Sequence, residues 1–242
     1  RVEDHRLVTG RGTYLADLVT EGTLHCGFVR SLVAHGKIRS VDRSDLASAR
    51  GVVGFFTADD LGLQEIPAVT GRGDAASHMT RPPLAVGRVR YVGEPIAVVV
   101  AESAAAAADA VEAVWVEIDE LPAVLDPELA AASETHLFDG GENLVSRSSI
   151  MAGPEPVAPP QVSRTVVVES QRLAPVSIET LGIVAEPVDP GLRVWCGHQA
   201  PHRLRDQLAD LLGLDRAEVR VTVPDVGGAF GMKGMFYPEY IV

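Results

Sequence analysis

The 242-residue sequence has few cysteines, few aromatic residues and no long apolar run. Its two cysteines, Cys26 and Cys196, lie far apart and follow no metal-ligand or redox spacing, so we expect both to be buried thiols. The longest apolar stretch, Ile96–Ala101, has the length of a strand and falls well short of the roughly 20 residues that span a membrane. The first six residues contain no apolar signal core. These features predict a cytoplasmic protein.

Basic clusters are missing as well. The formal net charge is −12, and no group of Lys or Arg interrupts the acidic background. Nucleic-acid-binding proteins usually carry a basic face, and attachment to an anionic membrane also needs basic residues, so we expect neither partner. The sequence does have a globular composition, with 46% hydrophobic and 22% charged residues. Because aromatic residues make up only 5%, the core must consist mainly of Val, Leu, Ala and Ile.

Short strands and helices alternate in the first half of the chain. The residue pattern predicts strands over 23–29 and 52–57 and a helical turn over 58–61. A short helix is expected over 44–49, capped by Ser44 and ended by Gly51. Residues 64–83 contain glycine and proline with little periodicity, which favours a loop.

The clearest βα unit begins at residue 96. Residues 96–101 are β-branched and apolar on both faces, as in a central strand. Ser103 then caps an alanine-rich helix over 104–113. Apolar and polar residues alternate over 114–119, which predicts a return strand.

Residues 127–163 form a compositional break. The ten residues 151–160 include four prolines, which excludes a helix or a central strand and predicts a linker or an extended surface crossing. A second domain then opens at Arg164. It contains a strand over 192–196, a helix that starts at Pro201, and a strand in which valines alternate. The helix has four leucines on its apolar face and Gly213 as its stop signal; these leucines are Leu204, Leu208, Leu211 and Leu212.

A glycine-rich segment, Val226–Lys233, follows the last strand. Gly227, Gly228 and Gly231 permit positive φ angles, and such a turn points successive N–H groups into a concavity that suits anionic oxygens. Phe230 has two interpretations: its ring lies against a bound group, or it plugs the core beneath a glycine turn. Short glycine motifs leave both open. The segment matches neither the P-loop nor G-x-G-x-x-G, which argues against a nicotinamide dinucleotide site.

Gly227–Lys233 resembles the G-G-[GA]-F-G-x-K loop of the molybdenum hydroxylases, the family of xanthine dehydrogenase, aldehyde oxidase and carbon monoxide dehydrogenase. Upstream, His198–His202 is similar to the T-Q-x-P-H segment of the same family. Four further segments carry the resemblance over nearly the whole chain: Arg1–Tyr14, Phe28–His35, Val89–Val100 and Leu121–Asp126. The sequence is thereby identified as the N-terminal part of the family's molybdopterin-binding large subunit.

The resemblance implies an α+β fold. Residues 1–13 would form an N-terminal arm, 14–126 an α/β hammerhead domain, 127–163 a Pro-rich linker, and 164–242 the first part of a molybdopterin-binding domain. The sequence departs from the family pattern at two points. The family's Glu-Pro-Arg-Gly run stands here as Glu179–Gly182 without the arginine, so no role of that arginine carries over. Ala229 replaces the commoner third glycine.

The resemblance also implies a cofactor site. The side chain of Gln199 would hydrogen-bond an oxo ligand of the metal, and four loop residues would shape the pocket wall beside it: Gly228, Ala229, Phe230 and Gly231. No residue of this chain is expected to bind the metal directly. His35 and His202 belong to structural segments and have no second ligand at helical spacing. The catalytic residue, a general-base glutamate, is expected beyond Val242.

The function implied is that of part of a molybdenum hydroxylase large subunit, inactive as this chain alone. Such an enzyme oxidises an aldehyde, an N-heterocycle or purine, or carbon monoxide, with water as the oxygen source. The cofactor would be molybdopterin in its cytosine dinucleotide form with molybdenum. Partners would be the remainder of the large subunit, an iron–sulfur subunit and an FAD subunit that take the electrons, in a dimer of heterotrimers. The alternative is a non-catalytic assembly or binding module, from a split or truncated subunit that lacks the glutamate.

Overall fold

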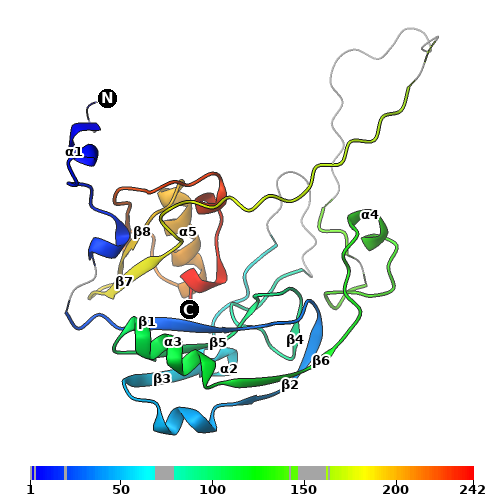
Figure 1. Cartoon of the computed structure of the whole chain (residues 1–242), viewed down its shortest axis with the longest axis horizontal. Coiled ribbons are helices and arrows are strands. Elements are labelled where there is room, and N and C mark those ends of the chain that lie inside the picture. The colour runs from blue at the N-terminus through cyan, green and yellow to red at the C-terminus, as the bar shows by residue number, and fades with distance from the viewer. Residues whose placement is uncertain are drawn as a thin grey trace.

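The computed structural model describes residues 2, 4–18, 21–68, 79–141, 143–146, 162 and 164–242. They form two units, each built on small three-stranded sheets (Figure 1). The first unit comprises the described residues between 21 and 146, with two of these sheets, and the second comprises residues 177–242, with one. Helices and strands occur in both, as expected for an α+β fold. None of the helices in the described ranges has the length and apolar character that crossing a membrane requires.

The first sheet holds the core of the first unit. Its strands lie in the antiparallel order β1 (His25–Arg30), β5 (Pro95–Ala101) and β3 (Val52–Thr57). The central position predicted for residues 96–101 is confirmed, since Ala97 and Val99 are fully buried. Helix α3 (Ala104–Glu112) packs on this sheet (Figure 1). It approaches β1 closely because Gly27 has no side chain; a Cβ there would lie 2.9 Å from the Ala107 carbonyl oxygen.

In the second sheet the chain follows a different course from the one expected for the βα unit. Its antiparallel order is β4 (Arg88–Val89), β2 (Gly36–Asp42) and β6 (Trp115–Glu120). Strand β6 therefore does not return to the sheet that contains β5 but pairs with β2. The physical reason is a second small core, in which Val116 and Ile118 of β6 pack against Val89 and Ile96.

Local details of the first unit differ from the sequence prediction at two places. The segment 44–49 forms a 3-10 helix, η2 (Ser44–Ser48), whose N-cap is Arg43 and not Ser44. The Asp42 carboxylate accepts the Ser44 N–H at 2.9 Å and so starts the turn one residue early. Cys26 is exposed, whereas Cys196 is buried as expected. Because Gly27 faces α3, the neighbouring Cys26 points to the opposite side of an edge strand.

The predicted end of the η2 helix at Gly51 is also wrong, because its C-cap is Ala49, but the signals of the next two helices are confirmed. Ser103 caps α3, where its hydroxyl accepts the Ala106 N–H at 3.1 Å. Helix α2 (Ala58–Leu61) follows Thr57, whose N–H donates to the Asp60 carboxylate at 2.7 Å. It ends at Gly62 in the left-handed conformation. Residues 66 and 81 pair as an isolated bridge, while residues 69–78 of the predicted loop lie outside the described residues.

The stretch after β6 is folded against the first unit. Helix α4 (Pro127–Ala130) is capped by the Asp126 carboxylate, which accepts the Glu128 N–H at 2.8 Å. Arg90 donates to the Leu137 carbonyl at 3.0 Å, and its guanidinium lies over the Phe138 ring. Residues 127–141, which belong to the expected linker, are therefore structured. The proline-rich residues 151–160 lie outside the described residues.

The second unit contains a parallel βαβ crossover. Strand β8 (Leu192–Cys196) pairs antiparallel with β7 (Ile183–Pro187) and parallel with β9 (Val219–Thr222). Helix α5 (Pro201–Leu212) joins the parallel pair and ends at Gly213 in the left-handed conformation, as predicted. Leu204 and Leu208 are buried and Leu211 packs beside them, but Leu212 is 37% exposed. It is the last residue of the helix, directly before Gly213.

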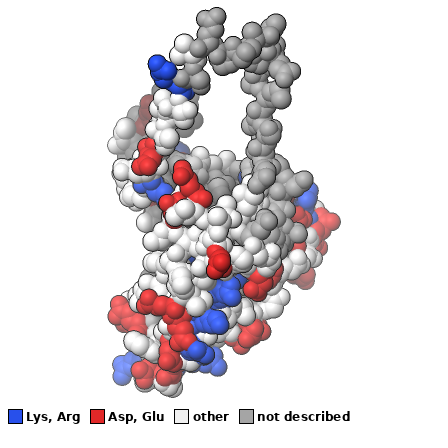
Figure 2. All heavy atoms as spheres, turned by 90° about the vertical axis from the view of Figure 1, so that its right-hand side faces the viewer, with Lys and Arg blue, Asp and Glu red and all other residues white. Residues whose placement is uncertain are grey.

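Surface charges in the visible part of the first unit are mixed. On the face shown in Figure 2, Lys and Arg side chains are interspersed with Asp and Glu, and those described form no continuous basic patch. Residues 164–176 run away from both units as an extended segment (Figure 1). Its valines are largely exposed, and these are Val166, Val167, Val168 and Val176.

Asn143 offers a test of how residues 127–146 are held. Its side-chain amide donates to the carbonyls of Ala130 at 3.0 Å and Thr135 at 2.9 Å, and accepts the Leu137 N–H at 3.2 Å. At about 0.5–1.5 kcal/mol for each bond, Asn143→Ala should make opening of this segment easier by about 2 kcal/mol. Amide hydrogen exchange at Leu137 measures this. The exposed Glu134→Ala is the control, and equal exchange in the two variants would contradict the account.

Candidate functional site

The glycine-rich loop lies between β9 and the 3-10 helix η3 (Met232–Gly234). Its backbone has positive φ at Gly228 (98°), Phe230 (46°) and Gly231 (86°). Phe230 is the one non-glycine residue with positive φ in the described ranges, a conformation that costs energy for a bulky side chain. Surrounding contacts must therefore impose the shape of this loop.

The Phe230 side chain does not plug the core. It is 73% exposed, so that interpretation of the sequence is wrong. Its ring lines a shallow, open hollow of about 530 Å³ together with Leu173, Ala174, Pro175 and Val176. The alternative, in which the ring lies against a bound group, stays a prediction.

Four successive backbone N–H groups of this loop, from Gly228 to Gly231, donate to no acceptor in the described parts of the chain. The loop closes on itself only at its end, where the Met232 N–H donates to the Ala229 carbonyl at 3.0 Å. A run of free donors in a turn that includes left-handed residues forms a concavity that binds anionic oxygens. The loop therefore has unused capacity for a ligand.

A buried ion pair fixes the loop from below. Lys233 is 1% exposed, and its Nζ lies 2.6 Å from Oε2 of Glu179. The same oxygen accepts the Gly227 N–H at 2.8 Å, while Oε1 accepts the Leu15 N–H at 3.3 Å. Glu179 thus contacts Gly227 at the start of the glycine loop, Lys233 at its end and Leu15 near the N-terminus.

The approach between Glu179 and the loop requires glycine. A Cβ on Gly227 would lie 2.5 Å from the Glu179 Cβ, and one on Gly228 would lie 3.0 Å from the Ser177 Cβ. Gly197, at the end of β8, also faces the pair, with Glu179 Oε2 3.4 Å from where its Cβ would be. The glycines predicted from the motif therefore serve close packing as well as backbone freedom.

Burial alone would raise the pKa of Glu179. The Lys233 ammonium and the N–H groups of Gly227 and Leu15 outweigh that effect, so the pKa lies below the usual value for glutamate. The carboxylate is consequently charged at neutral pH. The sequence motifs assign no role to Glu179 or Lys233. A signal for the pair was present, because a lysine in an apolar, glycine-rich segment needs a carboxylate partner when buried.

Gln199 lies beside this loop. It stands in the turn between β8 and α5, as predicted, and its N–H donates to the Lys233 carbonyl at 2.9 Å. Its side chain is exposed and passes close to η3: a Cβ on Gly234 would lie 3.5 Å from Oε1 of Gln199. The structure therefore brings together the two sequence motifs, which are about thirty residues apart.

Buried His198 reinforces that junction. Its Nδ1 accepts the Ala200 N–H at 3.0 Å, which leaves Nε2 to donate to the Met235 carbonyl at 3.3 Å. Burial lowers the pKa of this imidazole and keeps it neutral. The turn that carries Gln199 is thus attached to η3 at Lys233 and to Met235, the residue after it.

The other histidines considered in the sequence lie elsewhere. His35 is buried in the first unit with Nδ1 2.8 Å from the Pro122 carbonyl oxygen, and His202 is exposed on α5. Among the described residues, no group of three or more His, Cys, Asp or Glu is arranged to hold a metal ion.

Replacing Lys233 tests the ion pair. Lys233→Met keeps the apolar stem but leaves the Glu179 carboxylate without its cation, which should lower the free energy of unfolding by about 3 kcal/mol at pH 7. The exposed Lys37→Met is the control. Urea unfolding followed by the fluorescence of Trp195 on β8 reports on this unit. A loss no larger than that of the control would contradict the assignment.

The pH dependence of the same comparison has a defined sign. Because the pKa of Glu179 is depressed in the folded chain, its stabilisation is present above the pKa of the unfolded glutamate, about 4.3. That stabilisation disappears as the pH falls through the folded-state pKa. The difference between wild type and Glu179→Gln should therefore be full at pH 7 and shrink below about pH 4.

Comparisons with known proteins match both units. Residues 9–122 match the family model for the α/β hammerhead domain of aldehyde oxidase and xanthine dehydrogenase. Residues 158–242 match the model for a molybdopterin cofactor-binding domain. The ranges 9–122 and 158–242 together take in most of the chain.

Individual relatives agree. The chain is 36% identical to the nicotine 6-hydroxylase large subunit of Paenarthrobacter nicotinovorans, covering 99% of this chain and 30% of that protein. It is 33% identical to the carbon monoxide dehydrogenase large chain of Hydrogenophaga pseudoflava, covering 99% and 32%. The solved structure of quinoline 2-oxidoreductase from Pseudomonas putida 86 superposes with a TM-score of 0.84 at 38% identity, covering 100% of this chain and 31% of that one.

The chain spans about a third of the length of these relatives. Both the hammerhead fold and the start of a cofactor-binding domain, inferred from sequence motifs, are confirmed. The chain belongs to the aldehyde oxidase and xanthine dehydrogenase family of molybdopterin oxidoreductases and corresponds to the N-terminal part of their large subunits.

Proposed function

We propose that this chain is part of the large subunit of a molybdenum hydroxylase, and that Gln199 and the loop Val226–Lys233 form one wall of its cofactor site. The observation that carries the proposal is the hydrogen bond from the Gln199 N–H to the Lys233 carbonyl, which brings the two motifs together. The substrate class is an aldehyde, an N-heterocycle or purine, or carbon monoxide.

The residues present fit a molybdenum–molybdopterin group. The N–H groups from Gly228 to Gly231, which have no acceptor in the described residues, offer donors to oxygen atoms, and the exposed primary amide of Gln199, beside Gly234, adds a further donor. A wall of fixed donors in this arrangement suits a group that presents several oxygens. When bound, the cofactor supplies the oxidation–reduction chemistry, for which the protein provides position and electrostatics.

The chain's own residues have distinct parts in this proposal. Gln199 donates a hydrogen bond to an oxo ligand and so fixes its orientation. The backbone of Gly228, Ala229 and Gly231 shapes the wall, and the exposed ring of Phe230 presents an apolar surface beside it. Glu179 and Lys233 hold the loop in register from the protein side. No residue of the chain is assigned as the general base.

The remaining expectations belong to the same proposal. The cofactor would be the cytosine dinucleotide form, and the partners would be iron–sulfur and FAD subunits, in a dimer of heterotrimers in the cytoplasm. Relatives named as large subunits of nicotine 6-hydroxylase and carbon monoxide dehydrogenase support a multi-subunit assembly. The general-base glutamate would come from the part of the large subunit that these 242 residues do not include.

Molybdenum and pterin analysis of the purified assembly separates the two candidate functions. Stoichiometric molybdenum with an extractable pterin nucleotide is expected for an oxidoreductase. An assembly of correct subunit composition without molybdenum would contradict the proposal and favour the non-catalytic module.

Gln199→Ala tests the role of that side chain. In the assembled enzyme it should lower turnover by about 10²-fold, the loss typical when one preorganised donor is removed. Molybdenum content should be unchanged, because the backbone contacts of residue 199 remain. Gln207→Ala, the same change on the outer part of α5, should leave turnover as in wild type. Equal turnover in the two variants would remove Gln199 from the site.

A further inference from the structure

We propose that the N-terminal arm, residues 4–18, clamps the glycine loop at both ends, with Asp225 and Glu179 as positioning residues. The arm precedes the first unit in sequence, yet it lies beside the sheet of the second unit (Figure 1). This inference rests on the proposed function, because the loop that it positions is the wall of the cofactor site.

The first grip is at Asp225, directly before the loop. The Arg6 guanidinium binds its carboxylate through two nitrogens, with Nη2 2.6 Å from Oδ1 and Nη1 against Oδ2. The Thr13 N–H donates to Oδ2 at 2.7 Å, and the Asp225 N–H donates back to the Thr13 carbonyl at 2.9 Å. Two parallel bonds from arginine fix direction as well as distance. Asp225 is therefore held at four points by the arm.

The second grip is at Glu179. The Leu15 N–H donates to Oε1 of this carboxylate at 3.3 Å, while Oε2 binds Gly227 and Lys233. The Leu15 side chain also packs against Gly182, the residue directly before β7. A Cβ on Gly182 would lie 2.7 Å from Cδ2 of Leu15. Through this one carboxylate the arm reaches the start and the end of the loop.

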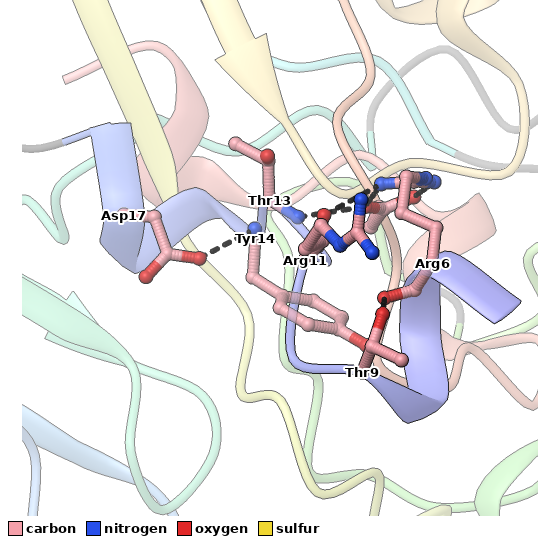
Figure 3. A network of polar contacts seen from close by, with 7 residues as sticks. Arg6, Thr9, Arg11, Thr13, Tyr14 and Asp17 are labelled. Atoms are coloured by element: carbon pink, nitrogen blue, oxygen red, sulfur yellow. Dashed lines mark hydrogen bonds and ion pairs between the residues drawn. The ribbon is translucent and has the colours of Figure 1, made fainter.

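The arm is organised by local polar contacts. The Thr9 hydroxyl donates to the His5 carbonyl at 2.6 Å. The Tyr14 N–H donates to the Asp17 carboxylate at 2.8 Å (Figure 3). Arg6 also donates to the Arg11 carbonyl at 3.3 Å, which aims its guanidinium at Asp225. Helix α1 (Asp4–Val8) and the 3-10 helix η1 (Leu15–Leu18) bury no residue.

That lack of burial separates the arm from the core. The hydrophobic core of the second unit consists of other residues, among them Val194, Leu204 and Phe236. The arm adds little to the core, but it makes directed, charge-assisted bonds at both ends of a strained loop. We therefore infer that its effect is on the shape of that loop. Phe230, with its positive φ, lies between Gly227 and Lys233, the two loop residues that Glu179 binds.

The experiment compares Arg6→Gln with Arg11→Gln in the assembled enzyme. Both changes remove a guanidinium from the arm, but only Arg6 contacts Asp225 through its side chain. In Arg6→Gln we expect hydrogen exchange of the hydrogen-bonded loop amides, those of Gly227, Met232 and Gly234, to accelerate by at least about tenfold, because charge-assisted bonds that hold the loop are lost. Exchange in β5 and α5 should be unchanged. Arg6→Lys keeps the positive charge but cannot form the two parallel hydrogen bonds, so it should restore the protection of the loop amides in part.

A spectroscopic readout tests positioning directly. The electron paramagnetic resonance spectrum of the partly reduced molybdenum should change in Arg6→Gln and stay as in wild type in Arg11→Gln. Molybdenum content should be the same in both. The clamp is wrong if loop exchange or the spectrum is identical in the two variants, or if exchange accelerates equally throughout the second unit.

Failure of the clamp is distinguishable from failure of the proposed function. A wild-type assembly without molybdenum would overturn the function, and with it the role of the clamp toward a cofactor. Molybdenum in full amount together with unaltered loop exchange in Arg6→Gln would overturn the clamp alone.

Discussion

A lysine ammonium is costly to remove from water unless a carboxylate accompanies it. At Lys233 that carboxylate is Glu179, and the geometry of the site follows from their contact. The pair lies under the glycine loop and beside the end of β8, and the Lys233 carbonyl receives the N–H of Gln199. This one interaction therefore fixes the relative positions of the loop, the strand-to-helix turn and the segment around residue 179.

These contacts explain how the energetically unfavourable backbone of the glycine loop is maintained. Phe230 with a positive φ, and four N–H groups that find no acceptor among the described residues, would not be stable in an isolated turn. Here Asp225 and Glu179 hold the two ends, and Gly227 and Gly228 let the loop approach Ser177 and Glu179. Strain and unused donors at one place are typical of a surface preorganised for a ligand.

Sequence periodicity predicted most elements because local rules govern them. Ser103, Pro201 and Gly213 mark helix ends through their own backbone chemistry, and the β-branched run around Val98 is central because it is apolar on both faces. Partners in space follow no such rule. The pairing of β6 with β2 and the exposure of Cys26 and Leu212 depend on which faces other elements cover. The motif resemblance located Gln199 and the loop, but the arm's contact with Asp225, more than two hundred residues away, appears only in the fold.

The central claim is that Gln199 and the glycine loop face the molybdenum cofactor. A crystal or cryo-electron microscopy structure of the assembled enzyme tests it most directly. The account predicts that the Gln199 amide nitrogen lies about 3 Å from an oxygen bound to molybdenum, a normal hydrogen-bond distance, with loop N–H groups turned to the same centre. A cofactor bound elsewhere, with Gln199 and the loop facing solvent or another polypeptide, would contradict it.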